Sequence, residues 1–226
     1  MLKNISKENG EDMKTKLNIY SMALMLGMGM ASASSVSQAA DGISTFADIG
    51  GYSQYVWRGA AQGTGQSSLQ GDVGVEHESG LSANVWFATG VGDSETEYDI
   101  TFDYSGEAGD IGYSVGYIMY KFVDDSSLDA EEAYLGASMG IASLTIYMGD
   151  GYNYIEAGVG DTVADMFDAS LSVGSNSPDS GSSTTHTTLS LSKDFDMGAY
   201  TLTPSITVGK VTDLDTEFVA GVNASF

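Results

Sequence analysis

Apolar and polar residues alternate along almost the whole chain after residue 40, and this period of two constrains the fold more than any other feature. In SLQGDVGVEHE (68–78), the apolar residues take odd positions and the charged residues take even ones. In EYDITFDYS (97–105), the two parities are exchanged. Side chains of a β-strand point alternately to its two faces, so such segments predict strands with one apolar and one polar face. No stretch after residue 40 shows the period of 3.6 that is typical of a helix.

About twelve segments of this kind follow one another, and each is about ten residues long, which is the length that a tilted β-strand needs to cross a bilayer. They lie near 45–58, 67–78, 81–91, 96–106, 110–121, 130–139, 141–149, 152–160, 166–174, 184–194, 199–209 and 216–226.

The N-terminal segment predicts export. MKTKLNIYSMALMLGMGMASASSVSQAADG (13–42) has lysines at its start, an apolar middle and small residues at its end, which is the pattern of a secretory signal peptide. We expect cleavage after Ala39, so that residues 1–39 are a signal peptide and residues 40–226 the mature domain. Residues 1–12 either lengthen its start or precede a true start at Met13. The alternative is an uncleaved anchor helix, although the apolar run is short for a membrane span.

Composition excludes several classes of function. The chain has 31 Asp and Glu residues against 8 Lys and Arg residues, for a net charge of -23. Cleavage leaves Arg58, Lys121, Lys193 and Lys210 as the cations, which are too scattered to contact nucleic-acid phosphates. The chain has no cysteine, so a disulfide scaffold, a thiol nucleophile and a lipid-modified N-terminal cysteine are excluded.

The connections between the segments alternate in length, as they do in bacterial outer-membrane barrels. Short turns such as Ser79-Gly80 alternate with longer polar loops such as RGAAQGTGQ (58–66) and GSNSPDSGSSTTH (174–186). The last segment ends on Phe226 and resembles the terminal strand that the outer-membrane assembly machinery recognises. We therefore expect that machinery, outer-membrane lipid and lipopolysaccharide as partners.

Aromatic residues lie mostly near the ends of the segments, which predicts two girdles at the lipid headgroups. The outer girdle is predicted to hold Tyr55, Trp57, Phe87, Tyr98, Tyr117, Tyr147, Tyr152 and Phe218. The periplasmic girdle is predicted to hold Tyr104, Tyr113, Phe167, Phe195, Tyr200 and Phe226.

Together these features predict an all-β, single-domain antiparallel transmembrane β-barrel in the bacterial outer membrane, with about twelve strands that follow the signal peptide. The alternative is a secreted soluble β-sandwich with one solvated face.

The chain also resembles a known family, the TorF-type proposed porins, which were long labelled bacterial proteins of unknown function. The resemblance covers about residues 45–160 and rests on YVWRG with Gln62, on LQGDVGVEHESG with Val85-Trp86, and on GYSVGYIMY and EEAYLGASMG. The chain departs from the family pattern at Ala60-Ala61, Ser67-Ser68 and Phe122-Val123. The resemblance implies export to the outer membrane and a role as a porin.

Strand parity places a series of polar residues on the inner face of such a barrel, where an acidic lining would favour cations over anions. Arg58 is the chain's only arginine, and it is predicted either to constrict the pore or to clamp carboxylates and fix the first loop. The predicted pore-lining residues are Arg58, Asp48, Gln54, Asp72, Glu76, Asp99, Asp103, Glu132 and Glu156.

No catalytic, metal or cofactor site is predicted. The two histidines, His77 and His186, lack a persuasive catalytic partner, and the chain has no Gly-x-Ser-x-Gly element. Carboxylates gather at 123–132 and 211–217, but neither loop has the spacing of a dedicated calcium loop. Solvated loop tips are therefore expected, and cations bridging them to lipopolysaccharide are the alternative.

The sequence thus predicts a porin that passes small neutral or cationic solutes through a narrow acidic lumen. Twelve strands lie between the roughly eight whose interior is filled by side chains and the roughly sixteen that leave an open pore. The alternative within the same fold is a non-conducting structural or adhesive barrel, and the sequence does not determine the solute or the oligomeric state.

Overall fold

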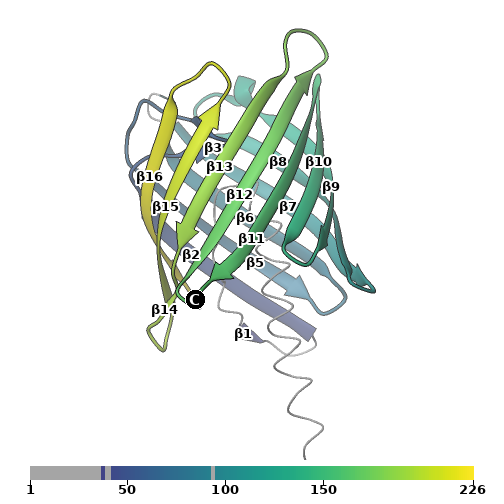
Figure 1. Cartoon of the computed structure of the whole chain (residues 1–226), viewed down its shortest axis with the longest axis vertical. Coiled ribbons are helices and arrows are strands. Elements are labelled where there is room, and N and C mark those ends of the chain that lie inside the picture. The colour runs from purple at the N-terminus through teal and green to yellow at the C-terminus, as the bar shows by residue number, and fades with distance from the viewer. Residues whose placement is uncertain (1–36, 39–41, 93–94) are drawn as a thin grey trace, which may run out of the picture.

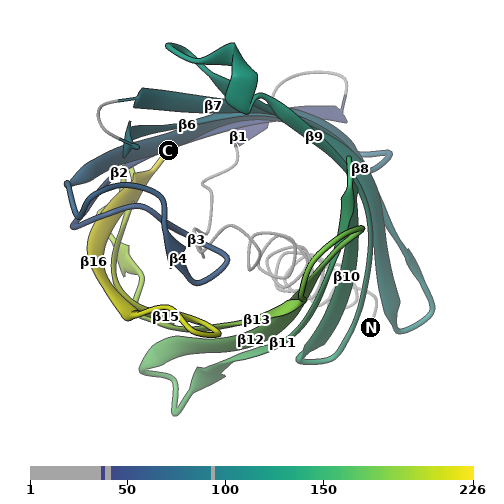
Figure 2. The ribbon, with the colours of Figure 1, turned by 90° about the horizontal axis from the view of Figure 1, so that it is seen from above.

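The computed structural model describes residues 37–38, 42–92 and 95–226, and their long strands form one closed antiparallel barrel (Figures 1 and 2). Each long strand pairs with its neighbours in the chain, and β2 pairs with both β5 and β16, which closes the sheet. The predicted all-β barrel of twelve strands is therefore confirmed. The barrel strands are β2 (Ile43–Tyr52), β5 (Ser68–His77), β6 (Leu81–Val91), β7 (Glu95–Ala108), β8 (Ile111–Phe122), β9 (Ala130–Met139), β10 (Ala142–Gly149), β11 (Tyr152–Val163), β12 (Phe167–Pro178), β13 (Thr184–Ser192), β15 (Thr201–Val211) and β16 (Thr216–Ser225).

The shorter elements lie at the ends of the barrel or inside it. β1 (Ser37–Gln38) pairs with β2, and β14 (Phe195–Asp196) pairs with β15. β3 (Val56–Trp57) and β4 (Ala60–Ala61) form a separate two-stranded sheet, and a short 3-10 helix spans Ser126–Leu128. None of the helices formed by the described residues is long and apolar enough to cross a membrane.

The alternation in sequence becomes an alternation between the outer and inner faces of the barrel. In β7, Phe102 and Tyr104 are 53% and 39% exposed, whereas Thr101 and Asp103 are 8% and 6% exposed. The apolar residues therefore point outward and the polar residues inward. A soluble sandwich buries its apolar face instead, so the arrangement excludes that alternative and matches a barrel whose outer surface faces lipid.

Two inward-facing glycines make room for inward-facing tyrosines. A methyl group on Gly116 would overlap the ring of Tyr134, and one on Gly174 would overlap the phenol of Tyr154. These glycines allow large rings to lie flat along the inner wall, where the tyrosines described below gather.

The connections between the strands lie at the two ends of the barrel, which we call the turn end and the loop end (Figure 1). The turn end has the short connections at 78–80, 109–110, 140–141 and 164–166, together with the segment 193–200 that contains β14. The loop end has the connections 53–67, 123–129, 150–151, 179–183 and 212–215.

The first connection of the loop end, residues 53–67, turns into the barrel (Figure 2). The first barrel strand ends at Tyr52, so the prediction that it continues to residue 58 is wrong. The chain leaves the sheet where Ser53 bonds to β16: the Ser53 amide donates to the Ala220 carbonyl at 2.8 Å, and the Ala220 amide donates to Ser53 Oγ at 3.0 Å.

The seam between the first and last barrel strands is short. β16 and β2 are in register over five residue pairs, from Gly221 with Tyr52 to Ser225 with Asp48, whereas β2 and β5 are in register over ten. The predicted signal peptide, residues 1–39, lies outside the described residues except for Ser37–Gln38, and its cleavage stays a prediction.

Candidate functional site

A β-hairpin inside the barrel carries the candidate site. Val56 pairs with Ala61 and Trp57 with Ala60, so Arg58 and Gly59 form a two-residue turn with φ of 48° and 78°. Positive φ at both central residues is typical of a type I′ turn, whose first position usually holds Asn, Asp or Gly. Arginine in this position adopts a backbone conformation that its own steric preferences oppose.

The tip of the hairpin contacts β15 through Gly59. A Cβ atom on Gly59 would lie 2.9 Å from the carbonyl oxygen of Lys210, and one on Gly209 would lie 2.9 Å from Gly59 Cα. The two backbones therefore touch, and this contact fixes the direction in which the neighbouring Arg58 side chain leaves the turn.

The Arg58 side chain crosses to β9 and forms a bidentate ion pair with Glu132. Arg58 Nη1 donates to Glu132 Oε1 and Nη2 donates to Oε2, both at 2.8 Å, and the two side chains are 4% and 0% exposed. Burial by itself lowers the pKa of Arg58, but the hydrogen bonds and charge of Glu132 raise it, and the pKa lies above its ordinary value. The guanidinium is therefore a permanent cation inside the barrel.

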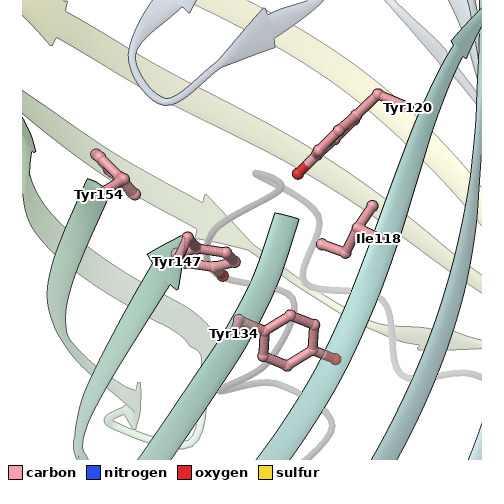
Figure 3. Packing of buried hydrophobic residues seen from close by; sticks show 5 residues of the cluster. All are labelled: Ile118, Tyr120, Tyr134, Tyr147 and Tyr154. Atoms are coloured by element: carbon pink, nitrogen blue, oxygen red, sulfur yellow. The ribbon is translucent and has the colours of Figure 1, made fainter. Parts of the chain in front are cut away.

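Aromatic rings surround the guanidinium. Arg58 Cζ lies 4.2 Å from the centroid of the Trp57 ring, 4.6 Å from that of Tyr147 and 4.0 Å from that of Tyr154, which are distances for cation–π attraction. Tyr147 and Tyr154 point into the lumen from neighbouring strands, together with Tyr120 (Figure 3).

Two further hydroxyls complete the surroundings of Glu132. Tyr120 Oη donates to Glu132 Oε2 and Tyr152 Oη donates to Oε1, both at 2.7 Å. The buried carboxylate thus accepts four hydrogen bonds, and burial of an ion pair is tolerated only when such bonds satisfy its remaining lone pairs. We call the groups that surround the guanidinium the Arg58 cage: Glu132, Tyr120, Tyr152, Trp57, Tyr147 and Tyr154.

A second set of contacts holds the base of the hairpin. The ring of Tyr55 lies 5.3 Å from that of Trp86, and its hydroxyl hydrogen-bonds Glu97. Burial raises the pKa of Tyr55 well above 10, so this hydroxyl remains a donor.

The inner wall is asymmetric in charge. Among the described residues, the fully buried carboxylates all lie on strands between β2 and β11. Several inner carboxylates there accept a bond from a neighbour: Asn84 Nδ2 donates to both oxygens of Asp72 at 3.0 Å, and Tyr134 Oη donates to Asp103 at 2.6 Å. Along the middle of β12, β13, β15 and β16, the inner face carries neutral groups instead. These are Ser170, Ser172, Ser190, Thr203, Thr207 and Asn223.

A match of sequence identifies the family. Residues 36–220 match the family described as "Bacterial protein of unknown function (Gcw_chp)". The chain belongs to this family. The resemblance over residues 45–160 falls within the matched region, whereas the TorF-type name is not part of the match and stays a prediction. A comparison with curated protein sequences gave no match.

The fold of this Gcw_chp protein is similar to that of solved porins. The KdgM porin has 12% sequence identity and a TM-score of 0.59, over 80% of this chain and 99% of that one. The KdgM porin in complex with disordered oligogalacturonate has 13% identity and a TM-score of 0.60, over the same shares of the two chains. At such identities the similarity is one of fold.

Most of the predicted pore-lining residues lie on the inner face, and the structure brings Arg58 and Glu132 into contact. Gln54 lies at the loop end instead, where its Nε2 donates to Glu217 Oε2 at 2.9 Å and to the Phe218 carbonyl at 3.2 Å. The remaining predicted residues on the inner face are Asp48, Asp72, Glu76, Asp99, Asp103 and Glu156.

The prediction that Tyr55 and Trp57 face lipid is wrong, because both lie on the hairpin inside the barrel. Tyr147 and Tyr152 also face the lumen, so their predicted place in the outer girdle is wrong as well. Parity could have identified Tyr147, since it shares the inner parity of Thr145. Tyr104, Tyr113 and Phe226 are exposed on the outer surface, where their place at the lipid boundary stays a prediction.

The histidines have structural contacts. His186 lies on β13 rather than in a loop, with its ring centroid 5.3 Å from that of Tyr154 and its Nε2 2.9 Å from Thr184 Oγ1. His77 Nδ1 lies 2.8 Å from Ser79 Oγ at a turn. Among the residues that the structure describes, no three His, Cys, Asp or Glu side chains are grouped so that they could hold a metal ion.

Proposed function

We propose that this Gcw_chp protein is an outer-membrane channel that lets small neutral or cationic solutes diffuse through a narrow acidic lumen. The observation that carries the proposal is the closed barrel with an apolar outer face and carboxylates along much of its inner face. Carboxylates that line a low-dielectric passage raise the local concentration of cations and repel anions.

The hairpin makes the proposed passage narrow. A barrel of twelve strands is wider than the roughly eight-stranded barrels that side chains fill completely, and narrower than porins of roughly sixteen strands. The hairpin extends inward from β2 to reach Glu132 on β9 (Figure 2). It therefore reduces the cross-section at the loop end, and solutes have to pass beside it.

The proposed solutes differ in charge from the oligogalacturonate that is bound to the KdgM porin. The KdgM porin has a structure in complex with oligogalacturonate, a chain of sugars that each carry a carboxylate. An acidic wall repels such a polyanion. We therefore propose solutes that are neutral or cationic for the Gcw_chp protein, despite the shared fold.

The experiment is conductance of the purified protein in planar bilayers. We expect ion steps, and a reversal potential in a KCl gradient that shows preference for K⁺. Lys193→Ala serves as a control, because Lys193 is exposed at the turn end, over the ring of Phe195, and it should leave the preference unchanged. Absence of ion steps at every voltage, or preference for Cl⁻, would overturn the proposal.

Location is tested separately. We propose that the protein resides in the outer membrane, that its terminal strand is recognised by the assembly machinery and that its loops meet lipopolysaccharide. The protein should partition with outer membranes and migrate faster in gels before heating than after. Recovery of the protein from the periplasmic supernatant, with the same gel mobility before and after heating, would refute this location.

The second candidate is a non-conducting structural or adhesive barrel. It is favoured by the near-complete burial of Arg58 and Glu132, since side chains that exclude water there would also exclude solutes. The same bilayer experiment separates the candidates: a protein that is folded in outer membranes and never conducts has this second role.

A further inference from the structure

The Arg58 cage binds its own arginine as it would bind a free guanidinium ion. The two hydrogen bonds from Arg58 to Glu132 both start from the terminal nitrogens of the guanidinium. The three ring contacts are likewise measured to its central carbon. None of these contacts involves the backbone of the hairpin. A planar cation at the end of any flexible chain can make the same set while the hairpin, which carries Trp57, stays in the lumen.

The carboxylate of the cage is already oriented for this geometry. Tyr120 and Tyr152 each donate to one oxygen of Glu132, so two parallel acceptor positions remain for a fork of two N–H groups (Figure 3 shows Tyr120 across the lumen from Tyr147 and Tyr154). Guanidinium matches such a carboxylate in bidentate fashion and stacks on aromatic faces, whereas ammonium is a compact and strongly hydrated point charge. The cage therefore selects guanidinium over ammonium.

The backbone of Arg58, whose side chain fills the cage, is strained. Arg58 takes a positive φ at a turn position that favours smaller residues. The hairpin is joined by only two residue pairs, and a two-stranded hairpin is marginally stable by itself. The hairpin is also held by the bond from the Gly92 amide to the Gln62 carbonyl at 2.7 Å, so a competitor for the cage would displace the Arg58 side chain while the hairpin stays in the lumen.

A second acceptor lies close to the cage. Oδ1 of Asp99 is buried without a hydrogen-bond partner among the described residues. Trp86 lies directly opposite Asp99 across β6 and β7, and the ring of Trp57 packs against the buried cluster that contains Trp86. A carboxylate oxygen and an indole face are further groups that attract a planar organic cation.

We propose that the Arg58 side chain is a tethered ligand in a binding site for small solutes that carry a guanidinium group, and that such solutes displace it as they pass. The inference rests on the proposed function, because the site lies in the proposed passage. A tethered ligand acts at an effective concentration of about millimolar or more. The native chain therefore competes with the solute, which weakens binding and speeds its release.

The test is a titration with methylguanidinium chloride followed by tryptophan fluorescence. The chain has two tryptophans, and Trp57 stacks on the guanidinium while Trp86 lies beside Asp99. Arg58→Ala vacates the cage, and we expect a saturable change with a dissociation constant at least about tenfold lower than in the native protein, since the tethered competitor is gone. Methylammonium chloride should bind Arg58→Ala more weakly.

Two variants serve as controls. Arg58→Ala combined with Glu132→Gln removes the carboxylate and should abolish saturation, which separates the cage from general effects of the salt. Lys193→Ala removes an exposed cation that also lies on an aromatic ring, 5.7 Å from the centroid of Phe195, and should behave like the native protein. Equal or unsaturable responses of Arg58→Ala and the native protein would overturn the inference.

If Arg58→Ala does not fold, the same titration uses Arg58→Lys, whose ammonium is a weaker competitor and should also tighten methylguanidinium binding. A response of Arg58→Lys identical to that of the native protein overturns the inference. The fluorescence experiment needs no conduction. A protein that conducts without binding methylguanidinium refutes the tethered-ligand inference alone, and one that binds it without conducting refutes the channel alone.

Discussion

The ion pair between Arg58 and Glu132 offers a quantitative test through a double-mutant cycle. Glu132→Gln leaves the guanidinium 4% exposed without a counter-charge, and it places an amide NH₂ where two donors from Arg58 already point. Removing one partner of a buried ion pair costs about 3–5 kcal/mol. The cost approaches the lower value here, because the guanidinium keeps its contacts with the rings of Trp57, Tyr147 and Tyr154.

Arg58→Met alone removes the cation but leaves Glu132 with its two tyrosine donors, so we expect a smaller loss of about 2–3 kcal/mol. In the double variant neither charge remains, and the amide oxygen that replaces the carboxylate can still accept from Tyr120 or Tyr152. Replacing a whole buried ion pair is often close to neutral. The double variant should therefore lose about 0–2 kcal/mol, which gives a coupling of about 3–6 kcal/mol between the two sites.

The measurement is urea unfolding of the protein from lipid vesicles, followed by tryptophan fluorescence under reversible conditions. Similar slopes with urea concentration for all four proteins would show that the free energies of unfolding are comparable. Losses that add within about 0.5 kcal/mol would show that the two residues act independently. Such additivity would refute the role of the ion pair in holding the hairpin.

Three further predictions concern the hairpin and its surroundings. Gly59→Ala should raise single-channel conductance and lower the free energy of unfolding by about 1–3 kcal/mol, because positive φ and the contact with Lys210 both oppose a side chain. Gly65→Ala is the matched control, since Gly65 has the same φ of 78° and nothing within 4 Å of an added Cβ atom. An equal effect of the two variants would contradict the role of Gly59 in the contact between the hairpin and β15. Tyr55→Phe should destabilise by about 1.5–3 kcal/mol in the same unfolding assay, since it removes the bond to Glu97, and a neutral result would contradict that bond. Lys121→Ala breaks an ion pair of 2.9 Å to Asp129 whose side chains are 30% and 26% exposed, so it should leave the urea midpoint of unfolding close to that of the native protein. A clear fall of the midpoint would show that this ion pair stabilises the protein more than its exposure indicates.

Most of the barrel could be predicted from the sequence, because strand parity is a local property that each segment carries by itself. Alternation in 97–105 is enough to place Asp99 and Asp103 on the inner face, as observed. The boundaries of the first strand fail for a related reason. Tyr55 and Trp57 share one parity and Gln54 and Arg58 share the other, but this arrangement fits a hairpin inside the barrel as well as a strand in its wall.

The Arg58 cage shows what parity cannot predict. The sequence predicts that Arg58 faces inward, and it does, but through the turn between β3 and β4 instead of through the strand. Its partner on β9 is 74 positions away in the chain, and no local pattern indicates which of many inward carboxylates a single arginine meets. The dipeptide Arg58-Gly59 does carry one usable signal, since glycine at the second position is typical of a type I′ turn.

The short pairing between β2 and β16, which closes the barrel, also affects when the root of the hairpin is fixed in place. The seam joins segments that are farther apart in the sequence than those of any other neighbouring barrel strands, so loop-closure entropy makes it the slowest ladder to form. The root of the hairpin is bonded to β16 just beyond it, through Ser53 to Ala220 and through Gln54 to Glu217. A barrel whose seam is still open lacks these bonds, so closure of the seam also fastens the root of the hairpin to β16.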